Sequence, residues 1–164
     1  MIIVEGIDRV GKSTLVNLLT EKTGLPVLAD KYMYEYSCMR SDSRVNMEKI
    51  QTIINVARDV SDNFILDRLH WSEYVYGLFD RGYENYEDIM LLENQLVDLG
   101  AKIILVTPTD IEESNRQHGE VLDKHSEVFN NLFINTKLKK FKCDYNTLSD
   151  AVDWVVEDEK HKLL

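Results

Sequence analysis

The chain has 164 residues, of which 44% are hydrophobic and 29% are charged, and its formal net charge is −10. This size and composition predict one globular domain, residues 1–164, with a substantial core. The negative charge argues against a protein that binds nucleic acid broadly through its phosphate backbone. We expect no leader segment, no membrane span and, with only Cys38 and Cys143 present, no disulfide framework; a cytoplasmic protein fits these features.

The most informative motif lies near the start of the chain. Residues 6–14 read Gly-Ile-Asp-Arg-Val-Gly-Lys-Ser-Thr and match the phosphate-binding pattern G-x-x-x-x-G-K-[ST] at every fixed position. An apolar, β-branched run at residues 1–4 precedes them, and leucines at helical spacing follow before a stop at residues 24–26. A strand, a loop and a helix in this order predict a phosphate-binding loop, not an ordinary glycine-rich turn.

Such a loop predicts binding of ATP together with Mg²⁺. Its backbone N–H groups form a concave anion site, and the helix that follows adds the positive end of its dipole. We expect Lys12 to reach the β- and γ-phosphates and the Ser13 hydroxyl to bind the Mg²⁺ that they carry. The predicted ATP-binding residues of the loop are Gly6, Ile7, Asp8, Arg9, Val10, Gly11, Lys12, Ser13 and Thr14.

The rest of the chain alternates between apolar strands and amphipathic helices. Further strands are expected at residues 26–29, 64–67, 102–106 and 140–144. Helices are expected at residues 47–62, 72–79, 85–99 and 149–157, the third with Asn85 and Asp88 at the spacing of a capping box. This alternation predicts an α/β fold in three layers, with a mainly parallel, roughly five-stranded sheet flanked by helices. Ligands of such sheets bind at the carboxyl ends of the strands.

Two stretches have no clean period. Residues 30–44 are rich in Tyr, Met and Ser and form a candidate binding loop. Residues 110–125 contain a polar break around Arg116 and are expected to form a short lid. A basic run near the C-terminus is expected to be solvated surface, and it consists of Lys137, Lys139, Lys140 and Lys142.

Charged residues next to the predicted elements suggest phosphate chemistry. Asp67 ends an apolar strand, where a carboxylate can hold Mg²⁺ through its water shell or can simply cap the strand end. Four arginines follow elements that should open onto one face, and a guanidinium group there can neutralise phosphoryl charge. These arginines are Arg9, Arg68, Arg81 and Arg116.

The loop and the segment after the third strand together resemble the thymidylate kinases and their nucleoside-kinase relatives. Residues 5–14 are similar to the loop of that family in its form with an internal Arg, and residues 67–76 resemble its D-R-Y-x-x-S-x-x-x-Y segment in register. The spacing from Tyr76 to Arg81 and the run from Val106 to Arg116 are also similar. The resemblance covers most of the chain. It implies a P-loop NTPase fold of the nucleotide-kinase type, ATP and Mg²⁺ as cofactors and, as in many relatives, a homodimer.

The resemblance also implies roles for individual residues. The catalytic set would be Lys12, Arg9, Asp67, Arg68 and Arg116, with Ser13 and Asp67 at the metal. Arg9 would bridge the transferred phosphoryl group, and Asn146 and Thr147 would lie near the adenine. Asp8 would touch the sugar hydroxyl of the acceptor, and Tyr76 would line its base pocket. The acceptor-binding set would be Asp8, Asp30, Arg68, Ser72, Tyr76 and Arg81.

Departures from the family pattern concern the acceptor. Asp30-Lys31-Tyr32 stands where the family has Arg-Glu-Pro-Gly, and Gly77 replaces a Gln. The spacing kept from Asp67 to Arg81 favours a pyrimidine deoxynucleoside monophosphate as the acceptor.

Asp30 supports an alternative, because a carboxylate there could act as the general base for a hydroxyl acceptor. That acceptor would be a deoxynucleoside or a hydroxymethyl pyrimidine, free or in DNA. A P-loop switch protein that hydrolyses GTP is a weaker alternative, because the chain has no N-K-x-D for guanine and no D-x-x-G after the third strand.

Overall fold

The core of the protein is a sheet of five parallel strands in the order β2-β3-β1-β4-β5. The computed structural model describes residues 1–28, 43–59, 63–110 and 123–161. The strands are β1 (Ile2–Glu5), β2 (Val27–Leu28), β3 (Ile65–Asp67), β4 (Lys102–Val106) and β5 (Lys139–Cys143). In the register of the central strand, Val4 lies opposite Asp67 of β3, and Glu5 lies opposite Leu105 of β4. The carboxyl ends of these strands therefore meet at one edge of the sheet.

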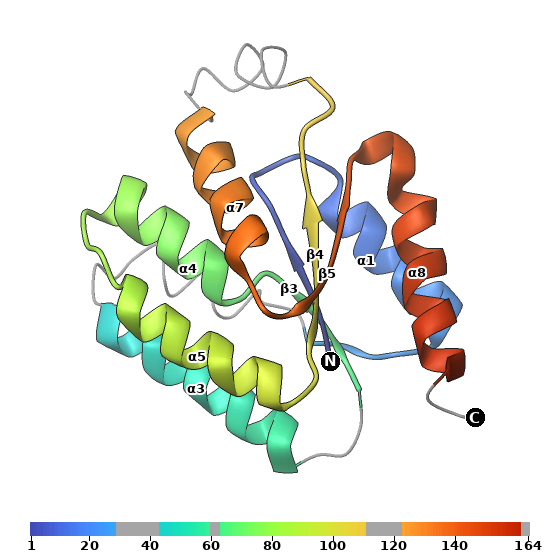
Figure 1. Ribbon diagram of the computed structural model, residues 1–164, viewed down its shortest axis with the longest axis horizontal. Coiled ribbons are helices and arrows are strands. Elements are labelled where there is room, and N and C mark those ends of the chain that lie inside the picture. The colour runs from blue at the N-terminus through green and yellow to red at the C-terminus, as the bar shows by residue number, and fades with distance from the viewer. Residues whose placement is uncertain (29–42, 60–62, 111–122, 162–164) are drawn as a thin grey trace.

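Helices cover both faces of this sheet. They are α1 (Lys12–Thr23), α3 (Ser43–Asp59), α4 (His70–Tyr76), a π-helix η1 (Gly77–Arg81), α5 (Tyr86–Asp98), α7 (Asp123–Asn135), a 3₁₀ turn η2 (Tyr145–Thr147) and α8 (Leu148–His161). Figure 1 shows α1 and α8 on one face, and α3, α4, α5 and α7 on the other. Every residue of β1 and β4 is buried, as expected of parallel strands covered on both faces. The predicted three-layer α/β fold is confirmed.

Several predicted boundaries agree with the structure, and others were wrong. The strand predicted at residues 102–106 is β4 itself, and α1 ends before Gly24 as predicted. Helix α3 begins at Ser43, so the end of the predicted loop at residues 30–44 is helical, and residues 29–42 lie outside the described part of the chain. Residues 123–125 of the predicted lid likewise belong to α7, and its other residues from 111 to 122 are not described.

The predicted capping box at Asn85 does not form. Asn85 is the N-cap of α5, but its side chain makes no capping hydrogen bond. Its amide instead donates to the Ser43 hydroxyl at 3.0 Å and lies 3.6 Å from the Met47 sulfur. A contact between α3 and α5 has therefore replaced the local one.

The segment after β3 also departs from the predicted helix over residues 72–79. The α-helix begins two residues earlier, at His70, and after Tyr76 it widens into the π-helix Gly77–Arg81, which has Gly82 as its C-cap. Single π-turns within helices are frequent at functional sites.

Contacts with neighbouring helices explain part of the basic run. Lys139 pairs with Asp158 of α8. The Lys140 ammonium donates to the carbonyls of Phe133 and Ile134 at the end of α7, at 2.8 and 2.9 Å. A cation at a helix C-terminus is favourable because the last carbonyls have no partner within the helix. No helix in the described part of the chain is long and apolar enough to cross a membrane.

Candidate functional site

The phosphate-binding loop lies between β1 and α1, at the carboxyl edge of the sheet. Gly6 has φ +141°, and a Cβ there would overlap the backbone carbonyl of Val106. Gly11 has φ +100°, and a Cβ there would lie 2.8 Å from the Tyr145 ring. Both positions combine a positive φ with a close neighbour, so they require glycine.

Lys12 is the first residue of α1, and its side chain reaches back to this loop. Its side chain is only 6% exposed, and its ammonium donates to the carbonyl of Ile7. Burial lowers the pKa of Lys12 to about 7, with a further lowering from the positive charge of Arg68. A phosphate placed beside this ammonium would stabilise its charged form.

The Arg68 side chain connects the end of β3 to the loop. Its guanidinium donates to the carbonyl of Gly6 at 2.8 Å and forms an ion pair with Asp8. It also donates to the hydroxyls of Ser72 and Tyr76, at 3.2 Å each. Positions 68, 72 and 76 repeat every four residues, so these hydroxyls lie on one side of α4. The structure thus brings together four predicted acceptor residues, namely Asp8, Arg68, Ser72 and Tyr76.

Asp67 has the properties expected of a metal-related carboxylate. Its Oδ1 atom is buried and accepts no hydrogen bond from the described residues. Ser13, one residue beyond Lys12 at the start of α1, is exposed at the loop. A carboxylate oxygen with no hydrogen-bond partner among the described residues and an exposed hydroxyl are oxygen ligands of the kind that Mg²⁺ prefers. The residues present therefore fit a magnesium ion carried by a nucleotide.

Other predicted residues are placed differently. Arg81 donates to the carboxylate of Glu73 at 2.8 Å and to its carbonyl at 2.9 Å, and its guanidinium stacks on Tyr83 at 5.3 Å. The guanidinium of Arg81 is therefore held by Glu73 of α4. Arg9 has φ +59° within the loop. Asp30 and Arg116 lie outside the described residues.

The segment after β5 contacts the loop through Tyr145, a residue that the sequence did not single out. The Tyr145 ring lies beside Gly11 and is part of a residue that is 60% exposed. Asn146 and Thr147, predicted near the adenine, make hydrogen bonds with Asp144 within the same turn. The Asp144 carboxylate accepts from the Asn146 N–H at 2.9 Å, and the Thr147 hydroxyl accepts from the Asp144 N–H at 3.0 Å. The signal for Tyr145 in the sequence was its place directly after the last predicted strand, because ligands of parallel sheets bind at the carboxyl ends of the strands.

Glu5, at the end of β1 directly before the loop, is a second residue to which the sequence analysis gave no role. It is fully buried and accepts hydrogen bonds from the segment that carries Arg68. Nothing local in the sequence indicates these contacts, since the partners are more than 60 positions away.

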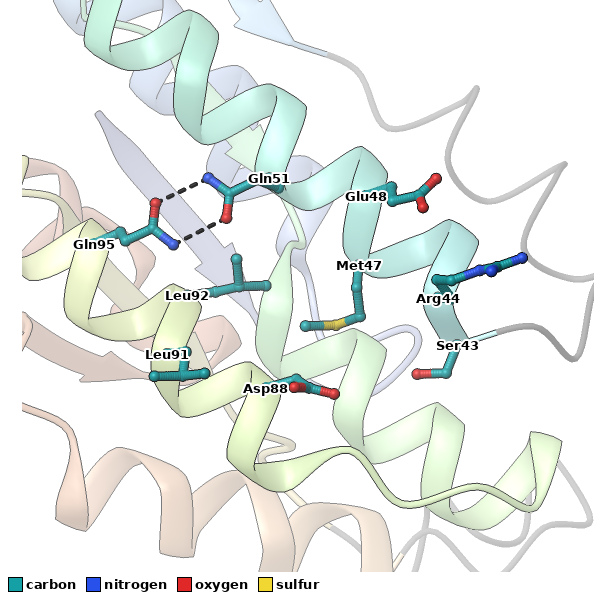
Figure 2. A pocket seen from close by; sticks show the side chains of 9 residues that line it. All are labelled: Ser43, Arg44, Met47, Glu48, Gln51, Asp88, Leu91, Leu92 and Gln95. Carbon is teal, nitrogen blue, oxygen red and sulfur yellow. Dashed lines mark hydrogen bonds between the residues drawn. The ribbon is translucent and has the colours of Figure 1, made fainter.

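A groove of about 620 Å³ lies between α3 and α5, away from the phosphate loop. Figure 2 shows Gln51 and Gln95 exchanging two hydrogen bonds across its end, each 2.9 Å long, and Met47, Leu91 and Leu92 lining its apolar part. No predicted site residue lines this groove. The phosphate loop, and not the groove, is therefore the candidate functional site.

Comparisons with known proteins establish the fold. No family model and no curated protein matches the sequence. Among solved structures, the YorR protein of Bacillus subtilis, in complex with phosphorylated GDP, aligns with a TM-score of 0.69 and 21% identity over 98% of this chain and 97% of that chain. The deoxyadenosine kinase of M. mycoides aligns with a TM-score of 0.56 and 13% identity over 98% of both chains.

A NadR protein in complex with NAD and AMP-PNP aligns with a TM-score of 0.53 and 20% identity over 95% of this chain and 48% of its own. The present chain thus spans about half of that protein. At these identities the likeness shows a shared fold, which is the P-loop α/β fold predicted from the sequence.

Proposed function

We propose that the protein is a kinase that transfers the γ-phosphoryl group of ATP, with Mg²⁺, to a pyrimidine deoxynucleoside monophosphate. The observation that carries the proposal is the contact of Arg68 with the phosphate loop, through the Gly6 carbonyl and the Asp8 carboxylate. A simple nucleotide-binding module needs the loop alone. A buried guanidinium from the turn after β3, held against that loop, supplies a positive group where an acceptor would meet the donor phosphates.

The donor side of the site follows from the loop. Lys12 would neutralise the β- and γ-phosphates, and Arg9 would bridge the transferred group. Ser13 and Asp67 would hold the magnesium ion, which supplies charge neutralisation on the phosphate oxygens. Arg116 would complete the site from the lid segment. Asn146 and Thr147 would lie near the adenine, and Tyr145, beside Gly11, would offer its exposed ring to the base.

The acceptor side supports a monophosphate through the arrangement on α4. Arg68 would hold the acceptor phosphate, with Ser72 beside it and Asp8 at the sugar. The Tyr76 ring, 5.2 Å from the Arg68 guanidinium, would line the base pocket. Phosphoryl transfer depends mainly on positioning and charge neutralisation, and an acceptor phosphate needs no general base at neutral pH.

A hydroxyl acceptor is the second candidate, and two contacts favour it. Arg68 already pairs with Asp8, and Arg81 already pairs with Glu73, so both predicted clamps for a phosphate dianion have a carboxylate partner. The similar NadR protein was solved in complex with NR. Under this alternative Asp30 would be the general base, and nucleic acid would be a partner only if the acceptor base lay in DNA.

A screen of ATP consumption over deoxynucleosides, their monophosphates and oligonucleotides tests both candidates. Lys12→Ala serves as the control, and its rate should fall by at least about 10²-fold because one preorganised charge contact is lost. A Lys12→Ala protein that turns over near the wild-type rate would remove the kinase proposal.

Two further variants separate the acceptors. With a monophosphate, Asp30→Asn should keep its activity and Arg68→Ala should raise the acceptor KM steeply. With a hydroxyl, Asp30→Asn should lose about 10²–10⁴-fold in rate, because it removes the base.

A further inference from the structure

Glu5 lies at the end of β1, directly before the phosphate loop, and its side chain is fully buried. Its Oε1 atom accepts hydrogen bonds from the backbone N–H groups of Leu69, at 2.9 Å, and Trp71, at 3.1 Å. A third N–H, that of Ser72, lies 3.3 Å from the same oxygen, and the Ser72 hydroxyl donates to Oε2. One carboxylate thus holds the turn between β3 and α4.

That turn has an unusual backbone. Arg68 has φ +75°, in the left-handed region that residues with a Cβ seldom adopt. Leu69 follows with φ −158° and ψ −115°. The N–H groups that start α4 have no partner within the helix, and in a buried turn they need an acceptor from elsewhere. Glu5 supplies that acceptor for the N–H groups of Leu69, Trp71 and Ser72, which directly follow Arg68.

A side-chain relay makes the same connection. Arg68 donates to the Ser72 hydroxyl at 3.2 Å, and this hydroxyl in turn donates to Glu5. The oxygen of Ser72 is therefore oriented to accept from the guanidinium because its hydrogen points to the carboxylate.

We propose that Glu5 is a positioning residue, which fixes the Arg68 guanidinium against the phosphate loop. It acts in two ways, through the backbone of the turn and through the Ser72 hydroxyl. The proposal rests on the proposed function in that Arg68 is taken to hold the acceptor. The residue that precedes the donor loop would thereby set the geometry of the acceptor side.

Glu93 of α5 provides a matched control. It is 6% exposed and accepts from the Trp71 indole and the Thr136 hydroxyl, each at 2.8 Å, with His70 Nε2 at 3.2 Å. Glu93 therefore holds the same chain segment, but through the side chains of His70 and Trp71. It makes no contact with the backbone N–H groups of the turn, nor with Arg68.

The first test compares Glu5→Gln with Glu93→Gln. In Glu5→Gln the carboxamide oxygen can keep the backbone contacts. The NH₂ group, however, now donates to the Ser72 hydroxyl oxygen and competes there with the Arg68 guanidinium. We expect kcat/KM for the acceptor to fall about tenfold or more, the factor typical of one charge-assisted hydrogen bond, with the ATP KM changed by less than about twofold. Glu93→Gln should lower the melting temperature while both KM values stay within about twofold.

A cycle with Arg68→Ala shows whether Glu5 acts through the arginine. In that background, Glu5→Gln should have no further effect on kcat/KM, because the positioned group is absent. If Glu5→Gln lowers kcat/KM equally with and without Arg68, or behaves like Glu93→Gln, the proposal is overturned. Should Glu5→Gln fail to fold, Ser72→Ala replaces it in the same cycle, since it breaks the relay and leaves the backbone contacts of the turn.

One measurement does not depend on catalysis. The arginine side-chain N–H signals of Arg68, assigned by NMR from their loss in Arg68→Lys, should shift in Glu5→Gln and stay in place in Glu93→Gln. Unchanged Arg68 signals in Glu5→Gln would refute the positioning role. A wild-type protein that transfers no phosphoryl group would contradict the proposed function alone, because the NMR comparison would still decide the role of Glu5.

Discussion

Nucleotide binding should be linked to proton uptake by Lys12. In the free protein, burial and then the charge of Arg68 lower the pKa of Lys12 from 10.5 to about 7. At about pH 7.5 such a lysine is about three-quarters neutral. Bound phosphates favour the ammonium form, so binding at this pH should take up about 0.75 proton per site. The apparent Kd for the nucleotide should rise about fivefold between pH 7 and pH 8, since more of the free protein must then be charged on binding.

Calorimetric titration with AMP-PNP in buffers of different ionisation enthalpy measures this uptake directly. The ligand's own phosphate titrates in the same range, so Lys12→Met provides the reference in which only that contribution remains. The difference between the two proteins should approach zero by about pH 6, where Lys12 is already charged. Equal proton uptake in wild type and Lys12→Met at pH 7.5 would show that Lys12 is already charged in the free protein. This result would contradict a pKa lowered by burial and by the charge of Arg68.

The same pKa shift has a consequence for stability with a definite sign. The pKa of Lys12 is lower in the folded protein than the 10.5 of the unfolded chain. Between about pH 7 and pH 10.5 the unfolded chain therefore binds more protons, and the contribution of Lys12 to the free energy of unfolding rises with pH. Below about pH 7 the penalty of burying the charged ammonium is fully present.

Three further predictions concern single residues. Arg116→Ala should lower kcat with little change in the acceptor KM, as expected of a group that closes over phosphates; a change confined to the acceptor KM would assign it to the acceptor. Tyr145→Ala should raise the ATP KM about tenfold, if its exposed ring beside Gly11 stacks on the base, and Tyr145→Phe should match wild type; equal KM values in all three proteins would rule out stacking. Gly11→Ala should destabilise the protein by about 1–3 kcal/mol in urea unfolding, because of its φ of +100° and its contact with Tyr145. Its cost should be smaller in the Tyr145→Ala background, and equal costs would mean that φ alone matters.

Local patterns in the sequence predicted most of the fold. Buried parallel strands are continuous apolar runs, and β4 was therefore predicted with its observed bounds. The end of α1 was equally clear, because Gly24 has the left-handed conformation of a helix C-cap. Two of the wrong predictions, the start of α3 and the cap of α5, occur where Ser43 meets Asn85. A pairing 42 positions apart leaves no periodic trace in the sequence.

The candidate site was predictable to the extent that motifs specify it. The four-residue spacing of Arg68, Ser72 and Tyr76 could be recognised, and these side chains do meet. The partners of Glu5 could not be recognised, because they depend on β1 and β3 being neighbours in the sheet. The order of the strands along the chain does not indicate that β1 and β3 are neighbours, because β2 lies between them in the sequence but at the edge of the sheet in the structure.

The departure at Gly77 has a physical cause in the packing beside α4. Gly77 has no side chain, and a Cβ there would lie 2.5 Å from the ring of Tyr83. The Tyr83 hydroxyl donates to Glu73, the same carboxylate that holds Arg81. A Gln at position 77 would displace this ring, and the displaced hydroxyl would leave Glu73 with less support.

Gly77, Tyr83 and Arg81 therefore form one packing unit around Glu73. Burial raises the pKa of Glu73, so loss of the Arg81 partner would favour its protonated form. Because Arg81 neutralises this buried carboxylate, an acceptor phosphate could recruit its guanidinium only by leaving Glu73 uncompensated. A monophosphate would accordingly be held by Arg68 and not by Arg81, which makes the effect of Arg68→Ala on the acceptor KM the measurement that separates the two acceptor classes.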